Sequence, residues 1–152
     1  MNKKMHIGVG IVVTVLLLGL VIPPLTDHET ADVKINGQAL TLTAADTWYE
    51  HLRGFQGIEL EGVKNDGMLM MYSKEAVRSF STKGIEFPVD VVWIKGSKVV
   101  RVDSGVQTSL ITGEEEVIDS APLSVDFIMI LPSEGTKKMF AVPGNLATIT
   151  LD

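Results

Sequence analysis

The 152-residue sequence contains no cysteine, and this absence excludes several kinds of chemistry. A disulfide framework, a thiolate zinc site and a cysteine nucleophile all need a residue type that the chain lacks. Positive charge is also scarce, because 13 Lys and Arg stand against 19 Asp and Glu, a net charge of −6. Nucleic-acid binding needs a surplus of basic residues to neutralise phosphates, so no nucleic-acid partner is expected. The length allows one domain of ordinary size.

Motifs of catalysis and metal binding are equally scarce. There is no Gly-x-Ser-x-Gly elbow, no His-Glu-x-x-His sequence and no run of alternating acids typical of a calcium loop. Aromatic residues form only 6% of the chain, which argues against the exposed aromatic platforms that bind sugars. We therefore predict no catalytic residue, no metal site and no cofactor.

One long apolar run stands at the N-terminus. No charged residue occurs from Ile7 to Leu25, and this stretch approaches the roughly 20 residues that span a bilayer as a helix. No Ala-x-Ala cleavage site follows it, which favours an uncleaved signal-anchor. Lys3 and Lys4 precede the run, so the N-terminus is expected in the cytoplasm. We predict a basic lead and transmembrane helix over residues 1–25, a tether over 26–30 and an extracytoplasmic domain over 31–152.

The remaining residues are typical of β structure. Asn36-Gly37 lies between two alternating apolar runs, the strongest short signal for a hairpin. Lys95-Gly96-Ser97 connects two further apolar runs, which we expect to be central and buried. Further short strands are predicted at 68–72, 77–80, 87–94, 98–102, 106–111, 127–131 and 147–151, and one short helix is predicted at about 48–53. The fold class is mainly β: a jelly-roll-like antiparallel sandwich or open barrel.

Several weak motifs also follow one another in a recognisable order. They are Arg53-Gly54-Phe55, Asp66-Gly67 with residues 68–72, Phe80, Phe87-Pro88-Val89-Asp90, residues 99–102, residues 127–135 and Pro143-Gly144-Asn145. This order resembles the domain-of-unknown-function 192 family over about residues 31–152. The resemblance implies a compact, mostly antiparallel jelly-roll sandwich, often exported or membrane-attached, with no established activity.

The chain departs from this family pattern in three places. A Phe-Trp-Met-x-Asn-Thr stretch of the family reads Phe80-Ser81-Thr82-Lys83-Gly84-Ile85 here. A late Leu-Glu pair falls near Met129-Ile130 without the acid, and a Gly-Asp turn becomes Gly144-Asn145. A family ligand site at these positions would be altered or lost.

Asp90 is the most informative polar residue, because a carboxylate within an apolar strand must be paired, protonated or used. Arg53 and Lys83 are its candidate partners. One interpretation is a buried structural ion pair that fixes the helix against the sheet. The other is a small ligand-binding pocket formed by Arg53, Lys83 and Asp90.

Met68, Met70 and Met71 resemble a soft-metal site, but alternation places the first two on one face of a strand and Met71 on the other, which favours core packing. The sequence therefore predicts a single-pass membrane protein whose non-enzymatic β-domain binds a protein or cell-envelope partner. The alternatives are a hydrolase or lyase that uses Asp90 as acid or base, and a metal-handling module that uses the three methionines.

Overall fold

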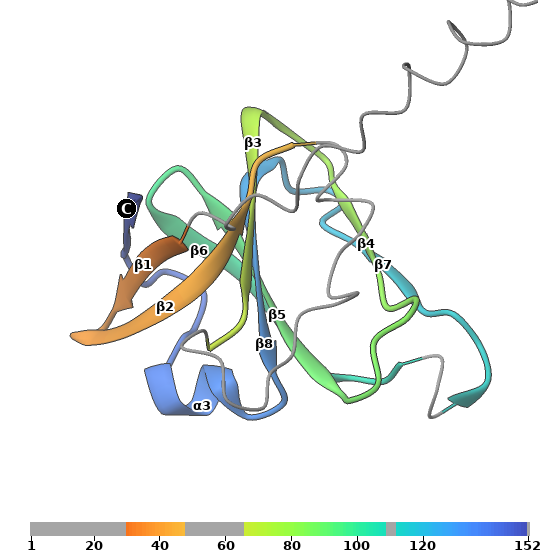
Figure 1. Cartoon of the computed structure of the whole chain (residues 1–152). Helices are drawn as coiled ribbons and strands as arrows, with labels where there is room; N and C mark the ends of the chain where they lie inside the picture. The colour runs from red at the N-terminus through yellow and green to blue at the C-terminus, as the bar shows by residue number, and fades with distance from the viewer. Residues whose placement is uncertain (1–29, 48–65, 109–111, 152) are drawn as a thin grey trace, which may run out of the picture.

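The computed structural model of the chain describes residues 30–47, 66–108 and 112–151, which form a mainly β structure with one short helix (Figure 1). The elements of this described part are β1 (Thr30–Ile35), β2 (Gln38–Ala45), β3 (Met68–Ala76), β4 (Ser79–Ser81), β5 (Val89–Lys95), β6 (Lys98–Val106), β7 (Val117–Asp119), β8 (Val125–Pro132), α3 (Gly135–Met139) and β9 (Ala147–Leu151).

Seven of these strands form one sheet in the order β6-β5-β8-β3-β2-β1-β9, while β4 pairs with β7 in a small second sheet. The two edges of the large sheet meet at one end, where Lys98 of β6 is bridged to Leu146, the residue before β9. Beside this bridge the amide of Val99 donates to the carbonyl of Asn145 at 2.9 Å. The large sheet is therefore a curled half-barrel. The mainly β class is confirmed, and of the two expected forms, a sandwich or an open barrel, the curled sheet is nearer to the open barrel.

One strand pair departs from the antiparallel pattern. β2 and β3 run parallel, with Thr43 opposite Met68 and Ala45 opposite Met70. A parallel pair needs a long crossover connection. The chain between the two strands, residues 46–67, is long enough to provide it.

The hairpin predicted at Asn36-Gly37 is confirmed. Both residues have positive φ angles, 51° and 81°, which a two-residue turn of type I′ requires. β1 alternates between buried and exposed residues, and its register pairs Ile35 with Gln38. The turn chemistry therefore determines which face of β1 points inward.

Two hydrophobic cores lie on opposite faces of the large sheet. β5 contributes to both, because its residues 89–94 are all buried and it pairs with β6 and β8. Val92 and Ile94 join the first core, which also takes residues from both ends of the sheet and Met139 of α3, so it fills the inside of the curl. Val91 and Trp93 join the second core, which also contains Phe80 of β4. The β4–β7 sheet therefore covers the outer face of β5.

Several predicted elements differ in the structure. β5 is central, but β6 is last in the sheet order, so only one member of the predicted central pair has two strand neighbours. The strand predicted at 106–111 is not found among the described residues of that range, because β6 ends at Val106 and residues 107–108 belong to no strand. Residues 109–111 lie outside the described residues. α3 and β7 were not predicted, because five and three residues are too few to show a hydrophobic period. The helix predicted at 48–53 lies outside the described residues.

No helix among the described residues has the length and hydropathy needed to cross a membrane. The apolar segment 7–25, where the membrane span is predicted, lies outside those residues.

Candidate binding surface

Asp90 is buried in β5, with 1% of its surface exposed, as its position in an apolar strand predicts. Its Oδ1 accepts a hydrogen bond from the amide of Gly105 at 2.8 Å. Its Oδ2 accepts two, from the amide of Thr136 at 3.1 Å and from the Thr136 hydroxyl at 2.7 Å. Both oxygens are therefore used to hold the chain at β6 and at the first turn of α3.

This arrangement explains how α3 begins. The residue before the helix, Glu134, makes no side-chain capping bond. The Asp90 carboxylate binds the Thr136 amide in its place, and an unsatisfied amide of a first helical turn needs such an acceptor. Asp90 thus caps a helix that lies 46 positions further along the chain.

The predicted partners of Asp90 are not found beside it in the described part of the chain. Lys83 is exposed in the loop after β4, and no ion pair between described residues includes Lys83 or Asp90. Arg53 lies outside the described residues. The structure instead brings Gly105 and Thr136 to Asp90, with the Ser104 hydroxyl 3.4 Å from that of Thr136. The pocket of Arg53, Lys83 and Asp90 stays a prediction.

The three methionines pack as alternation predicts. Met68 and Met70 are buried in the second core, whereas Met71 packs against the first core from the other face of β3. The Tyr72 hydroxyl lies 3.9 Å from the sulfur of Met70. Within the described ranges, no group of three His, Asp or Glu is placed to hold a metal ion.

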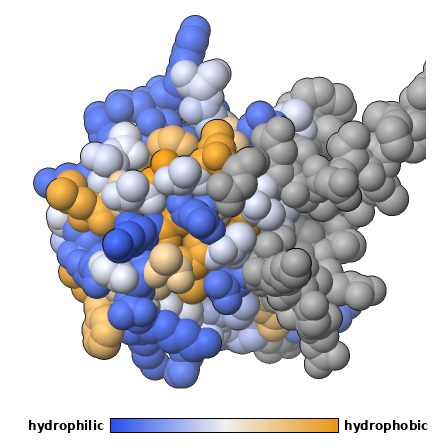
Figure 2. Space-filling model, turned by 60° about the vertical axis from the view of Figure 1, so that its left-hand side comes forward, coloured by the Kyte–Doolittle hydropathy of each residue, from blue (hydrophilic) through white to orange (hydrophobic). Residues whose placement is uncertain are grey.

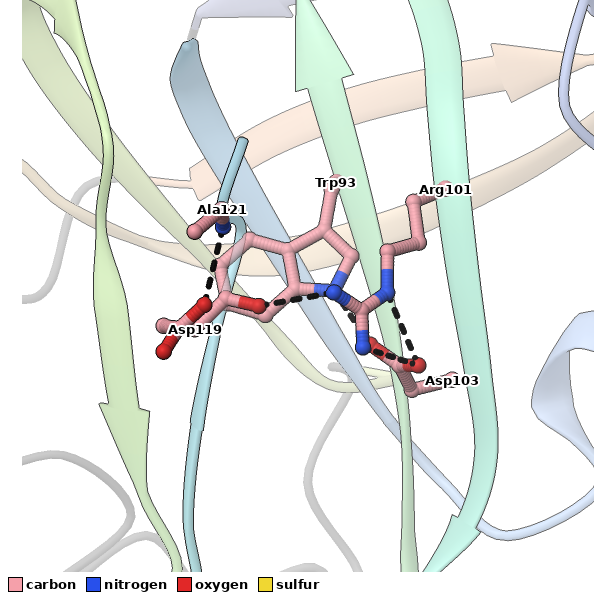
Figure 3. A network of polar contacts seen from close by, with 5 residues as sticks. All are labelled: Trp93, Arg101, Asp103, Asp119 and Ala121. Carbon is pink, nitrogen blue, oxygen red and sulfur yellow. Dashed lines mark hydrogen bonds and ion pairs between the residues drawn. The ribbon is translucent and has the colours of Figure 1, made fainter. Parts of the chain in front are cut away.

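A polar network at β6 was not predicted from the sequence (Figure 3). The buried indole N–H of Trp93 donates to Oδ2 of Asp103 at 2.6 Å. Arg101 donates to Oδ1 of Asp103 from Nε at 3.0 Å and from Nη2 at 2.8 Å. Its Nη1 donates to the carbonyl of Asp119 in β7 at 2.9 Å. Every nitrogen of the Arg101 guanidinium is therefore hydrogen-bonded. Because one of these bonds reaches β7, the network holds the small sheet over the second core.

The clearest exposed feature is an apolar loop between α3 and β9, which we define as residues 140–146 and call the apolar loop. Phe140 is 71% exposed, Val142 54% and Leu146 70%. Met139 and Ala141, which alternate with Phe140 and Val142, are buried in the first core. Figure 2 brings forward the side of the molecule where β1, β9 and α3 lie, and hydrophobic patches alternate with hydrophilic ones there. Because three large exposed apolar side chains fall within seven residues, the apolar loop is the candidate contact surface.

The apolar loop is held in a defined conformation by two asparagines. Nδ2 of Asn36, in the β1–β2 turn, donates to the carbonyl of Phe140 at 2.8 Å and to Oδ1 of Asn145 at 3.1 Å. The same Oδ1 accepts from the amide of Val142 at 2.8 Å. Phe140 keeps a left-handed backbone with φ 52°, which is uncommon for a bulky residue. The exposed side chains thus project from a backbone that is hydrogen-bonded to Asn36 and Asn145.

Sequence reasoning missed this surface. It singled out Pro143-Gly144-Asn145 only as a turn in which Asn replaces Asp. The structure shows that the amide oxygen of Asn145 still accepts two hydrogen bonds there. Residues 139–142 are apolar throughout, so the sequence carries no alternation that could have indicated which of these side chains are exposed.

Comparisons with known proteins place the fold. A family model, DUF192, described as "Uncharacterized ACR", matches residues 31–146. No curated protein matches the chain. A solved structure of a "putative transcription regulator" from Sinorhizobium meliloti 1021 is 17% identical, with a TM-score of 0.66, over 79% of this chain and 92% of that one. A protein of unknown function from Novosphingobium aromaticivorans DSM 12444 is 13% identical, with a TM-score of 0.62, over 78% and 83%. At these identities the likeness concerns the fold alone.

Proposed function

The chain belongs to the DUF192 family, and we propose that it is a membrane-anchored, extracytoplasmic binding domain without catalytic activity. In this proposal the N-terminal segment holds the protein in the cell membrane with its N-terminus in the cytoplasm. The apolar loop is the surface through which the domain binds a component of the cell envelope.

The anchor is supported by the sequence. Residues 7–25 carry no charge, two lysines precede them, and the next basic residue after them is Lys34. That distribution of charge orients a single span with its N-terminus inside. The tether of residues 26–30 is short, so the β-domain stays near the membrane surface.

The binding role rests on one observation, which is the exposure of Phe140, Val142 and Leu146 on a hydrogen-bonded loop. Apolar side chains at such exposure are in water, and covering them is favourable in proportion to their area. Their backbone is already ordered by Asn36 and Asn145, so little conformational entropy is lost when a partner covers them. A preorganised apolar surface of this kind suits binding.

The geometry of Asp90 supports the same conclusion. A general acid or base must reach the proton that it transfers. Asp90 is buried, and its two oxygens accept three hydrogen bonds from the protein itself. These contacts favour a structural role for the carboxylate over an acid–base role.

Fractionation of cells that make the full chain with a C-terminal tag tests the anchor. We expect the protein to resist alkaline extraction from membranes and to be digested when protease is added outside intact spheroplasts. A soluble protein that starts between residues 23 and 31 would contradict the anchor.

Photo-crosslinking in the same cells tests the binding surface. A photo-reactive phenylalanine analogue at position 140 is compared with the same analogue at Val77, which is 51% exposed and joins β3 to β4. We expect crosslinked products, to protein or to lipid, from position 140 and far fewer from position 77. Equal yields at the two positions would contradict a binding role of the apolar loop.

A further inference from the structure

We propose that the partner of the apolar loop is the phospholipid surface itself, so that the domain docks on the membrane that holds its anchor. This inference rests on the proposed function and names its ligand as anionic phospholipid. Three features of the molecule support it: the chemistry of the loop, the charge around it and the reach of the tether.

The chemistry of the loop fits a bilayer interface. Phe140, Val142 and Leu146 project from a backbone whose carbonyls and amides are partly satisfied by Asn36, Asn145 and Val99. Apolar and aromatic side chains that enter the boundary between headgroups and acyl chains bind in proportion to their buried area. Satisfied backbone groups lower the cost of that entry.

Four lysines lie near the apolar loop, either in the sequence or in the pairing of the sheet. Lys137 and Lys138 in α3 come directly before the loop, and Lys98 is bridged to Leu146. Lys34 is exposed in β1, opposite Thr148 of β9. Lysine side chains beside an inserted apolar residue extend their ammonium groups to the phosphates. This pattern is notable because residues 5–152 as a whole contain 11 basic and 19 acidic residues, a net charge of −8.

Acidic groups nearby moderate this charge. Glu134 pairs with Lys137 at 2.8 Å. Asp126 accepts from the amide of Gly96 in the β5–β6 turn, and Asp32 accepts from the Thr41 hydroxyl. The positive excess around the loop is therefore small, and the apolar side chains supply the larger share of the attraction. Anionic lipid is expected to strengthen binding that the apolar contact begins.

The tether permits this contact. β1 starts at Thr30 and ends beside Asn36, which holds the loop, so the two points are about 20 Å apart at the usual rise of a strand. Residues 26–29 span up to about 14 Å when extended. Because this length is shorter than β1, the domain can tilt until the loop end of β1 meets the bilayer that contains the anchor.

The test uses the full chain reconstituted in vesicles of phosphatidylcholine and phosphatidylglycerol, with brominated lipids that quench tryptophan. Three variants are compared, Phe140→Trp, Leu146→Trp and the control Val77→Trp, each after subtraction of the unsubstituted chain, whose own tryptophans are Trp48 and Trp93. We expect quenching at positions 140 and 146 to be at least about twofold that at position 77, because only the loop residues enter the acyl region.

The outcomes separate the two proposals. A chain that stays with the vesicles on flotation but shows no greater quenching at positions 140 and 146 than at 77 overturns lipid docking and leaves the anchor intact; a protein partner for the loop is then favoured. A chain that does not float with the vesicles contradicts the anchor itself. Equal quenching with and without phosphatidylglycerol overturns both the choice of anionic phospholipid and the role of the lysines, and reduced quenching without it supports both.

Discussion

The hydroxyl of Thr136 donates to the Asp90 carboxylate at 2.7 Å, across 46 positions of the chain. This bond joins the buried centre of β5 to the first turn of α3. Because α3 leads directly into the apolar loop, Asp90 is a structural support for the proposed binding surface.

Removal of the Asp90 carboxylate is expected to destabilise the domain. Asp90→Ala leaves the Gly105 and Thr136 amides and the Thr136 hydroxyl without their acceptor, and we expect a loss of about 3 kcal/mol or more in the free energy of unfolding. Urea denaturation of the variants measures it. The double variant Asp90→Asn with Thr136→Val should lose less free energy of unfolding than the sum of the losses in the two single variants. A double-mutant cycle of Asp90→Asn with Arg53→Met tests the predicted ion pair. Strictly additive losses for Asp90→Asn and Thr136→Val would contradict the hydrogen bond between these two side chains.

The network of Figure 3 gives a second stability prediction. Asp103→Ala removes the acceptor of the buried Trp93 indole N–H and frees Arg101, so we expect a loss of about 2 kcal/mol. Asp119→Ala is the matched control, because Arg101 binds the carbonyl of residue 119 and not its carboxylate. The control should lose no more than about 1 kcal/mol, from the exposed bond to the Ala121 amide. Equal losses in the two variants would show that the indole bond contributes nothing.

The conformation of the apolar loop should depend on the side chains of Asn36 and Asn145, and three substitutions test this. Asn36→Gly retains the positive φ of the turn but loses the side-chain bonds to Phe140 and Asn145, so hydrogen exchange at the Val142 amide should become faster. Asn145→Asp keeps the accepting oxygen and should leave that exchange slow, whereas Asn145→Ala should accelerate it. Fast exchange in Asn145→Asp would show that the acceptor is not what orders the loop.

Tyr72 gives a prediction on pH. Burial raises the pKa of Tyr72 above its ordinary value of 10.0, and the positive charge of Arg78, 4.0 Å from the ring centroid, lowers this pKa in part. The folded state therefore prefers the neutral phenol. Its contribution to stability is present below the pKa of the unfolded chain and is lost as the pH rises through the folded-state pKa.

The ultraviolet absorbance of phenolate in a Tyr49→Phe background measures this ionisation, since the chain has two tyrosines. Arg78→Met should raise the pKa of Tyr72 further, because the favourable charge is gone. A Tyr72 pKa at or below 10.0 in the folded protein would contradict the role of burial.

A fragment of residues 30–152 should fold alone as a β-dominated monomer. The described sheet begins at Thr30 and contains both hydrophobic cores. Far-ultraviolet circular dichroism is the measurement, and a spectrum dominated by helix would be the contrary result. The stability experiments above use this fragment.

The sequence alone determined those features that depend on neighbouring residues. The Asn36-Gly37 turn, the buried run of β5 and the opposite facing of Met70 and Met71 follow from local backbone preferences and from a period of two, and all are confirmed. The order of short motifs over about residues 31–152 also indicates the family, and the family model matches residues 31–146.

Only the tertiary structure decided which distant groups meet. The curl of the sheet brings Lys98 to Leu146, and Asn36 to Asn145, across 48 and 109 positions. The burial of Asp90 followed from its strand, but its partners did not, because backbone amides and a threonine hydroxyl carry no charge that a sequence pattern could match to a carboxylate. Exposure of Phe140 and Leu146 was likewise decided by packing, since Met139 and Ala141 occupy the core positions that this short stretch of chain could reach.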